Sequence, residues 1–369
     1  MRGGDGAAKV WLSVVWWRWH DAMVVGLGGG SARKCEQRRV SPPGRVVLLV
    51  TAGDGSGAWW DSTNAPAALG GLGQRPGVGS LRSIGGMTDL LARDASALVG
   101  QSRQDALAAA DRAGVAIRAL DTLPELSAAY ELYRRIWRPD AEHVALSVEI
   151  LRGLSKAGGY VVGAYAGEQL VGVSVGLNGV PASGRLHSHM AGVAPEAQGR
   201  SVGSAIKLHQ RAWALASGIS TVAWTFDPLV RRNAYFNLAK LGARPEAYLT
   251  DFYGPMTDGI NGGDASDRLL VGWDLAVPFP PAGAADDGGV PALIRCTDEG
   301  VPHVVASSAG LVAVPTPPDV ESLRQTEPRV AAAWRHAVRE ALAGELSTGS
   351  TVTGFSRTGS YLVARKDNA

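Results

Sequence analysis

Two groups of residues in the second half of the chain have the types and spacing to do chemistry, and the first is a pair of histidines. His187 and His189 are separated by one residue in an apolar segment. If this segment is a strand, both imidazoles project from the same face. Histidine titrates near neutral pH, so either ring can serve as a general base, and a structural role within the sheet is the alternative. No metal site is expected, because no third ligand is visible in the sequence.

The second group is a glycine-bearing segment, Gly192-Val-Ala-Pro-Glu-Ala-Gln-Gly-Arg-Ser-Val-Gly-Ser-Ala205. A strand is predicted to end here, a loop to turn and a helix to begin. Such a loop points consecutive backbone N–H groups at one spot, next to the positive end of the helix. Gly199 and Gly203 let a diphosphate approach the backbone, and Arg200 contributes a positive charge. The spacing differs from the G-x-G-x-x-G of dinucleotide-binding proteins. The segment therefore predicts a diphosphate cradle, with a simple strand-to-helix turn as the alternative.

The elements that must position these groups follow from the hydrophobic pattern and from turn and cap residues. Strands are expected over residues 115–120, 160–165, 170–177, 185–193, 221–226, 247–253 and 269–275, and helices over 123–137, 146–156, 201–217 and 230–241. Shorter strands and a helix over 328–346 follow. This order predicts the α+β class, a central mixed β-sheet with helices on both faces and a smaller C-terminal α+β part.

A family resemblance rests on the glycine-bearing segment. Gln198-x-x-Ser201-x-Gly203 resembles motif A of the GNAT superfamily of N-acetyltransferases, whose pattern is [R/Q]-x-x-G-x-[G/A]. The order of elements from Val115 to about Tyr253 is similar to that fold. A bacterial branch of the superfamily that carries a C-terminal extension is similar in other segments: His187–Met190, Asp227–Leu229, Asn261–Arg268 and the helix with Trp334–Arg335.

The resemblance implies how acetyl-CoA, or another short acyl-CoA, would be bound as co-substrate. In the GNAT fold the strand before motif A splays from its neighbour and binds the pantetheine arm. By this resemblance Ala191, Gly192 and Val193 would bind pantetheine. The pyrophosphate would be bound through the main chain of Gln198, Gly199, Arg200, Ser201, Val202, Gly203 and Ser204. Ser201 stands where the family has glycine, so the cradle is kept only if this residue avoids positive φ.

The implied activity is direct transfer of the acyl group to an amine of a small molecule or protein. This reaction requires a deprotonated amine and a stabilised thiolate leaving group. Many family members carry a glutamate on the strand before motif A, but residues 185–193 contain no carboxylate. His187 and His189 are therefore the candidate bases. In the family a tyrosine of the second helix serves as general acid, and its position corresponds to Leu238 here. Tyr235, one turn earlier, is therefore the candidate acid, with a packing role as the alternative.

Three other polar positions are expected to have structural roles. His209 lies on an apolar helix stripe and is expected at the edge of the core. Asp227 precedes a proline and is expected to cap a turn. The aspartates near the end of the domain, Asp264 and Asp267 among them, miss the spacing of a calcium loop and are expected in a polar loop at the rim of the site.

Composition excludes several classes of protein. The chain has 369 residues, of which 46% are hydrophobic and 19% charged, so it is not wholly disordered. The two cysteines cannot form a disulfide framework, which fits a cytoplasmic protein. The net charge of +2 predicts neither nucleic acid nor a membrane surface as a partner. The most apolar early stretch, Val10–Leu27, is interrupted by Arg18, His20 and Asp21 and is not expected to span a membrane.

The first part of the chain differs from the rest in composition. Before Met87 lie 18 of the 48 glycines and six of the 11 tryptophans. The expected organisation is a low-complexity region, 1–86, that is disordered or precedes the true start; a helical lead-in, 87–113; the GNAT-like acyl-CoA-binding domain, 114–277; a linker, 278–291; and a C-terminal α+β extension, 292–369. The oligomeric state is left open.

A second function remains open at this stage. The missing glutamate and the displaced tyrosine also fit a non-catalytic GNAT-like module that binds CoA as a sensor or scaffold. In that case the C-terminal extension would serve for interaction. An assay for thiol release over a panel of amines separates the two hypotheses.

Overall fold

The computed structural model describes residues 47–51, 57–61, 82–138, 146–254, 264–281 and 283–366, with side chains described from residue 94 onward. The chain divides into two compact units, Met1–Gly79 and Ser80–Ala369. In the first unit β1 (Val47–Thr51) and β2 (Gly57–Asp61) pair in antiparallel fashion. The predicted low complexity of residues 1–86 otherwise lies outside the described residues. All candidate site residues belong to the second unit.

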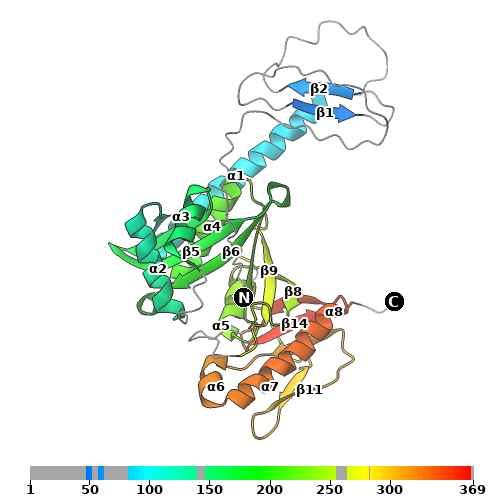
Figure 1. Ribbon diagram of the computed structural model, residues 1–369. Helices are drawn as coiled ribbons and strands as arrows, with labels where there is room; N and C mark the ends of the chain where they lie inside the picture. The colour runs from blue at the N-terminus through cyan, green and yellow to red at the C-terminus, as the bar shows by residue number, and fades with distance from the viewer. Residues whose placement is uncertain are drawn as a thin grey trace, which may run out of the picture. The chain divides into compact units, whose positions relative to one another are not determined.

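A seven-stranded mixed sheet forms the centre of the second unit, in the order β3-β4-β5-β6-β7-β9-β8 (Figure 1). Its strands are β3 (Ala116–Ala119), β4 (Tyr160–Ala166), β5 (Gln169–Asn178), β6 (Arg185–Val193), β7 (Thr221–Phe226), β8 (Arg244–Leu249) and β9 (Arg268–Asp274). All neighbours pair antiparallel except β6 and β7, which are parallel. The predicted fold class is confirmed.

Helices cover both faces of this sheet. They are α1 (Arg82–Ala113), α2 (Leu123–Trp137), α3 (Val148–Lys156), α4 (Val202–Ala216) and α5 (Arg231–Ala234), which continues as a π-helical turn, Tyr235–Lys240. Short 3₁₀ turns lie at Pro181–Ser183 and Pro195–Ala197. Helices α2 and α3 pack on one face, where their apolar side chains meet those of β4 and β5. Helix α4 packs on the other face and has α1 alongside it.

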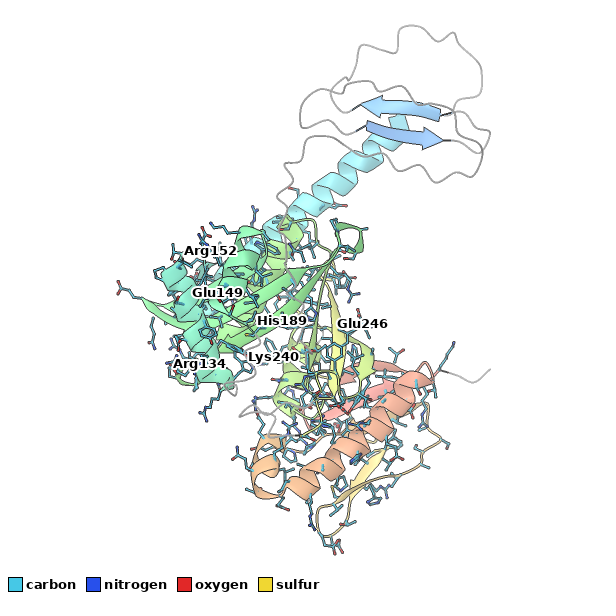
Figure 2. The ribbon with its side chains drawn as sticks, viewed as in Figure 1. Arg134, Glu149, Arg152, His189, Lys240 and Glu246 are labelled. Atoms are coloured by element: carbon cyan, nitrogen blue, oxygen red, sulfur yellow. The ribbon has the colours of Figure 1, made fainter. Side chains whose placement is uncertain are left out.

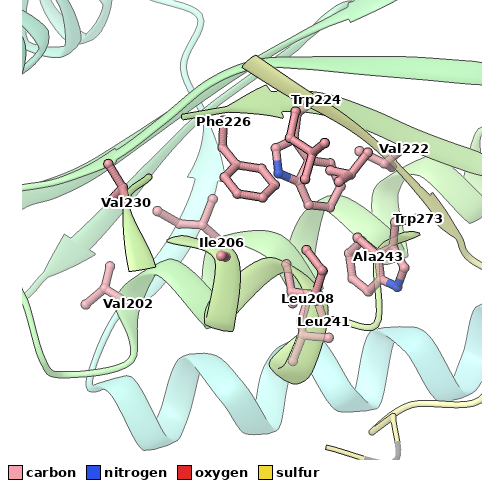
Figure 3. Close-up of a cluster of buried hydrophobic side chains, with 14 of the residues drawn as sticks. Val202, Ile206, Leu208, Val222, Trp224, Phe226, Val230, Leu241, Ala243 and Trp273 are labelled. Carbon is pink, nitrogen blue, oxygen red and sulfur yellow. The ribbon is translucent and has the colours of Figure 1, made fainter. Parts of the chain in front are cut away.

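The core between α4 and the sheet is apolar and closely packed. Figure 3 shows Ile206 and Leu208 of α4 among Val222, Trp224 and Phe226 of β7. All five side chains are buried. Burying a side chain of this size stabilises the fold by about 1.5–3 kcal/mol. This packing fixes α4, and with it the loop that precedes it, against β6 and β7.

The C-terminal part of the second unit has its own small sheets and helices. Strands β10 (Ile294–Cys296) and β11 (Pro302–Val304) pair with each other, and β12 (Leu311–Pro315), β13 (Thr351–Phe355) and β14 (Ser360–Ala364) form a sheet in the order β12-β14-β13. Its helices are α6 (Val320–Thr326), α7 (Pro328–Val338), a π-helical turn (Arg339–Ala343) and α8 (Gly344–Ser347). Among the described helices of the chain, none is long and apolar enough to cross a membrane.

Several predicted boundaries are wrong for identifiable reasons. The lead-in helix begins at Arg82, five residues before the expected start. Strand β8 ends at Leu249, because Asp251 turns the chain with a left-handed φ of 46°. Helix α6 was not expected, although Asp319 caps it by accepting a hydrogen bond from the Ser322 N–H.

A buried ion cluster joins the C-terminal part to the sheet. We call Asp227, Asp264, Arg324 and Arg335 the Asp227 cluster. Arg335 of α7 donates to both carboxylate oxygens of Asp227 at 2.8 Å, and Arg324 of α6 donates to Asp227 at 2.5 Å. Both arginines also contact Asp264. Burial raises the pKa of Asp227, but the two arginines outweigh it and lower the pKa to about 2.

The Asp227 cluster changes the expected role of the acidic loop. Asp227 does cap its turn, since it accepts the Leu229 N–H at 2.9 Å, as predicted. Asp264 and Asp267, however, do not form a solvated rim. Asp267 is buried and binds Arg339 and the Tyr248 hydroxyl. The composition of the 264–267 segment did not indicate the arginine partners, because Arg335 and Arg339 lie about seventy residues away in the sequence.

We predict that Asp227→Asn destabilises the protein by on the order of 3 kcal/mol, because it leaves the buried Arg335 guanidinium without its main counter-charge. Chemical denaturation measures this change. Glu246→Gln is the matched control: it breaks the exposed Arg185–Glu246 pair and should cost less than about 1 kcal/mol. Equal effects of the two substitutions would show that the Asp227 cluster does not hold the C-terminal part.

Candidate functional site

The two central strands of the sheet separate after a short paired segment. β6 and β7 pair only through Arg185↔Thr221, Leu186↔Val222 and His187↔Ala223. Beyond this point β6 stays paired with β5 and β7 stays paired with β9. We call the diverging segments, 188–193 of β6 and 224–226 of β7, the fork. The fork leaves one backbone edge of each strand without a strand partner in the middle of the sheet.

The backbone of β6 presents hydrogen-bonding groups to the fork. The Ala194 N–H donates to the Val171 carbonyl at 2.8 Å, so the backbone groups of Ala194 point toward β5. Along a strand, the backbone groups of successive residues point alternately to the two sides. This alternation directs the backbone groups of Gly192 toward β5 and those of Ala191 and Val193 into the fork. Consistently, the Val193 carbonyl accepts the Gln198 side-chain amide rather than a group of β5.

Gly192 has a packing role instead. A methyl group at this position would overlap the indole ring of Trp137, at the end of α2. Trp137 in turn stacks against Tyr133, with ring centroids 5.1 Å apart. Glycine at position 192 therefore allows an aromatic wall to lie against β6 on the face covered by α2.

The loop before α4 holds two residues in unusual backbone conformations. Gly199 has a φ of 78° and Ser201 a φ of 64°, so both adopt the left-handed region. The first hydrogen bond of α4 runs from the Ala205 N–H to the Ser201 carbonyl at 3.1 Å. The amides of Val202, Gly203 and Ser204 precede it and point out of the helix end. A methyl group at Gly203 would have no atom nearer than 4.0 Å.

The conformation of Ser201 contradicts the sequence-based expectation. The cradle was expected to be kept only if Ser201 avoided positive φ, and the φ of 64° does not meet that condition. A non-glycine residue in this region costs about 1–2 kcal/mol. The Ser201 side chain forms no capping hydrogen bond that would offset this cost. The nearby Arg200 is exposed, and its guanidinium extends toward Gly114 at the end of α1.

We predict that Ser201→Gly raises the free energy of unfolding by about 0.5–1 kcal/mol, because glycine removes the strain but loses more chain entropy on folding. A melting-temperature scan or denaturant titration measures it. Ser204→Gly is the control: this residue is helical, so glycine should destabilise by about 1 kcal/mol. Destabilisation by both substitutions would show that Ser201 is unstrained.

His187 and His189 lie together on β6, with ring centroids 5.9 Å apart. Figure 2 shows His189 on this central strand. An irregularity in the pairing of β5 and β6 leaves His189 without a residue directly opposite it. Burial lowers the pKa of both rings, and for His187 the neighbouring His189 and Lys207 lower it further. Both imidazoles are therefore mainly neutral at pH 7 and able to accept a proton.

A buried lysine, which sequence reasoning missed, lies next to the fork. Lys207 of α4 is 5% exposed, and its Nζ donates to Ser188 Oγ at 2.9 Å and to Gln210 Oε1 at 3.2 Å. The same Nζ lies 3.7 Å from the ring centroid of Trp224. Among the ion pairs of the described residues, none includes Lys207. Burial lowers its pKa to about 7. The i, i+4 spacing from Gly203 was the available signal, since it places Lys207 on the same face of α4 as the cradle.

Three tyrosines near the central sheet lie in different surroundings. Tyr235, the candidate acid, lines a cavity of about 370 Å³ together with Arg231, Phe355 and Arg357, toward the C-terminal part. Tyr248 donates to Asp267 at 2.6 Å, and burial followed by this bond raises its pKa. The Tyr253 hydroxyl lies 3.1 Å from Thr225 Oγ1, on the β7 side of the fork.

The remaining candidates have structural roles. His209 lies within the core edge, with its Nδ1 3.0 Å from the Tyr160 hydroxyl, as predicted. Glu196, beside the cradle, pairs with Arg135 at 3.0 Å. Within the described ranges no group of three or more His, Cys, Asp or Glu residues is arranged to hold a metal ion.

The buried lysine gives a signed pH prediction. Between pH 7 and about 10.5 the unfolded chain holds a proton on Lys207 that the folded protein has released, so stability rises with pH in this window. Relative to Lys207→Met, the wild-type protein should gain about 1.4 kcal/mol per pH unit from pH 7 to 10. Denaturation of both proteins across this range measures the slope. A constant difference would mean that Lys207 stays protonated or exposed.

Comparison with known proteins gives matches among solved structures. No protein-family model matches the chain, and no curated protein sequence does. The chain is similar over 45% of its length to the ribosomal-protein-S18-alanine N-acetyltransferase of Escherichia coli, with 16% identity, 97% of that structure covered and a TM-score of 0.36. A GNAT-family acetyltransferase of Streptococcus pneumoniae matches over 43% of this chain and 97% of its own, with 16% identity and a TM-score of 0.36.

A third match is the PaiA N-acetyltransferase of Thermoplasma acidophilum, in complex with coenzyme A. It has 14% identity and a TM-score of 0.31, and it covers 43% of this chain and 98% of its own. At these identities and TM-scores the matches assign neither an activity nor a substrate to this chain.

Proposed function

We propose that the protein is an acyl-CoA-dependent N-acyltransferase, most simply one that moves acetyl from acetyl-CoA to an amine. The observation that carries this proposal is the fork between β6 and β7, whose open end leads to the backbone cradle at the start of α4. One groove thus combines strand edges that can pair with amides and a helix end that attracts a diphosphate. CoA carries the matching groups in the same order, the amides of its pantetheine arm followed by its pyrophosphate.

The residues of the groove fit such a ligand. Ala191 and Val193 direct backbone groups into the fork, where they can pair with the amides of a pantetheine arm. The amides of Val202, Gly203 and Ser204 can hold the pyrophosphate, and the open space at Gly203 lets it approach. The one carboxylate of the loop, Glu196, is already neutralised by Arg135. When bound, acetyl-CoA supplies an activated acyl thioester.

The chain's own residues can then assist transfer to an amine. His187 is the last residue of β6 before the fork, and its lowered pKa keeps the ring ready to take a proton from the acceptor. His189 shares the surface and can orient or replace it. Trp137 forms part of the wall on the same face as these rings. The acceptor amine is proposed to approach from this face.

The non-catalytic module remains the second candidate. Two observations favour it: β6 has no carboxylate, and Tyr235 lies in a cavity toward the C-terminal part. Thiol release from acetyl-CoA over a panel of small amines and N-terminal peptides separates the candidates. CoA binding without turnover on any acceptor would favour the module.

We predict that Gly203→Glu weakens CoA binding at least a hundredfold while the protein stays folded. The new carboxylate would repel the diphosphate, although it suits the first turn of a helix. Gly203→Gln is the neutral control of the same size, and it should retain more affinity than Gly203→Glu. Calorimetric titration with CoA measures both. Unchanged affinity in a folded Gly203→Glu protein would refute the cradle.

We predict that His187→Ala lowers turnover by about 10²–10⁴-fold, the range for loss of a positioned general base. Affinity for acetyl-CoA should change little, because backbone groups after residue 190 hold it. The acidic limb of the wild-type pH–rate profile should lie below pH 6.5, since burial lowers the pKa of His187, and it should disappear in the variant. His189→Ala is the companion variant. If both variants keep the wild-type rate and profile, the base lies elsewhere.

A further inference from the structure

The position of the Lys207 side chain relative to the fork suggests a further role. His187↔Ala223 is the last pair between β6 and β7, and Ser188 and Trp224 are the first residues beyond it. The Lys207 Nζ contacts both, at 2.9 Å from Ser188 Oγ and 3.7 Å from the Trp224 ring centroid. The amine therefore lies where the two strands begin to separate, which is the closed end of the fork.

We propose that Lys207 receives the sulfur end of CoA and protonates the departing thiolate. This inference rests on the proposed function and offers Lys207 as the general acid in place of Tyr235. The chemical class it recognises is a thiol or thiolate at the end of a pantetheine arm.

The direction of the groove supports this assignment. The cradle lies at the open end of the fork, near Val193, and Lys207 lies at the closed end, beside Ser188. Five residues of strand separate Val193 from Ser188, which is roughly 16 Å at about 3.3 Å per residue. An extended arm anchored by its diphosphate at the cradle thus points its far end toward the amine.

The environment of Lys207 also explains why an anion would be attracted there. Its two hydrogen-bond partners are neutral, and its third neighbour is an aromatic ring. Within the described part of the chain, no ion pair includes Lys207: His187, whose pKa the lysine lowers, is mainly neutral, and Arg211 on the same helix pairs with Asp105 of α1. A buried cation with neutral partners is costly unless a counter-charge arrives. The thiolate provides that charge at the moment of transfer.

The proposed step balances in atoms and electrons. The acceptor nitrogen forms a bond to the acyl carbon and loses a proton to His187 or water. The carbon–sulfur bond breaks, and its electron pair stays on sulfur. Sulfur takes a proton from the Lys207 ammonium, which leaves CoA as the thiol and Lys207 as the neutral amine. The proton lost by the acceptor returns to Lys207 through solvent. The folded pKa of about 7 lies near that of a thiol, about 8.5, so this transfer is well matched near neutral pH.

The test compares CoA with desulfo-CoA, the analogue that lacks the sulfur, by calorimetry at pH 7. The wild-type protein should bind CoA about tenfold more tightly than desulfo-CoA, because the hydrogen bond between the thiol and the Lys207 amine is lost in the analogue. Lys207→Met should bind both equally, with the affinity that the wild type has for desulfo-CoA. Tyr253→Phe, which removes the hydroxyl on the other side of the fork, is the control and should keep the wild-type preference.

Each outcome separates this inference from the proposed function. If neither ligand binds to the wild type, the proposed function fails. If both bind but the wild type shows no preference for CoA, or Lys207→Met keeps the preference, the assignment of Lys207 is overturned. Acetylation of Lys207 itself on incubation with acetyl-CoA, seen by peptide mass spectrometry, would also overturn it, because the amine would then be an acceptor. Near-ultraviolet circular dichroism verifies that each variant is folded.

Discussion

The parallel pairing of β6 and β7, limited to three residue pairs, is the constraint on which the site depends. If pairing continued past His187, the backbone groups of Ala191 and Val193 would pair with β7, and no unpaired strand edge would lie in the middle of the sheet. The strands separate because each is held by its outer neighbour, β5 on one side and β9 on the other. Helix α4 packs against both strands, and Figure 3 shows its Ile206 and Leu208 among the buried side chains of β7.

The sequence revealed most of the features that depend on neighbouring residues. The turn from strand to helix at Gln198–Gly203, the hairpin of β4 and β5 and the ends of α2 follow from local patterns, such as the capping box of Thr122 and Glu125. The φ of Ser201 could not be predicted in this way, since the same letters fit a helical or a left-handed residue. The loop closes in the left-handed form because α4 is fixed by its packing below the fork.

Features that depend on distant residues were hidden. From the local sequence Lys207 is expected to be solvated. In the structure its amine contacts the ring of Trp224, from β7, and the hydroxyl of Ser188, from β6. Asp227 reads as a turn cap, which it is, but Arg335 lies 108 residues further along the chain. In both cases a charge is buried by an element that local sequence does not specify. The local sequence therefore does not predict the surroundings or the pKa of such a buried charge.

The Asp227 cluster links the β7 side of the fork to helices near the end of the chain. Asp227 directly follows Phe226, the tip of the β7 side of the fork, and its carboxylate is gripped by arginines from α6 and α7. The hydroxyl of Tyr361, in β14, donates to the carbonyl of the next residue, Pro228. Residues beyond position 320 thus help to fix the position of the β7 tip of the fork. Substitutions in those last helices would therefore move the β7 tip of the fork without changing any residue of the fork itself.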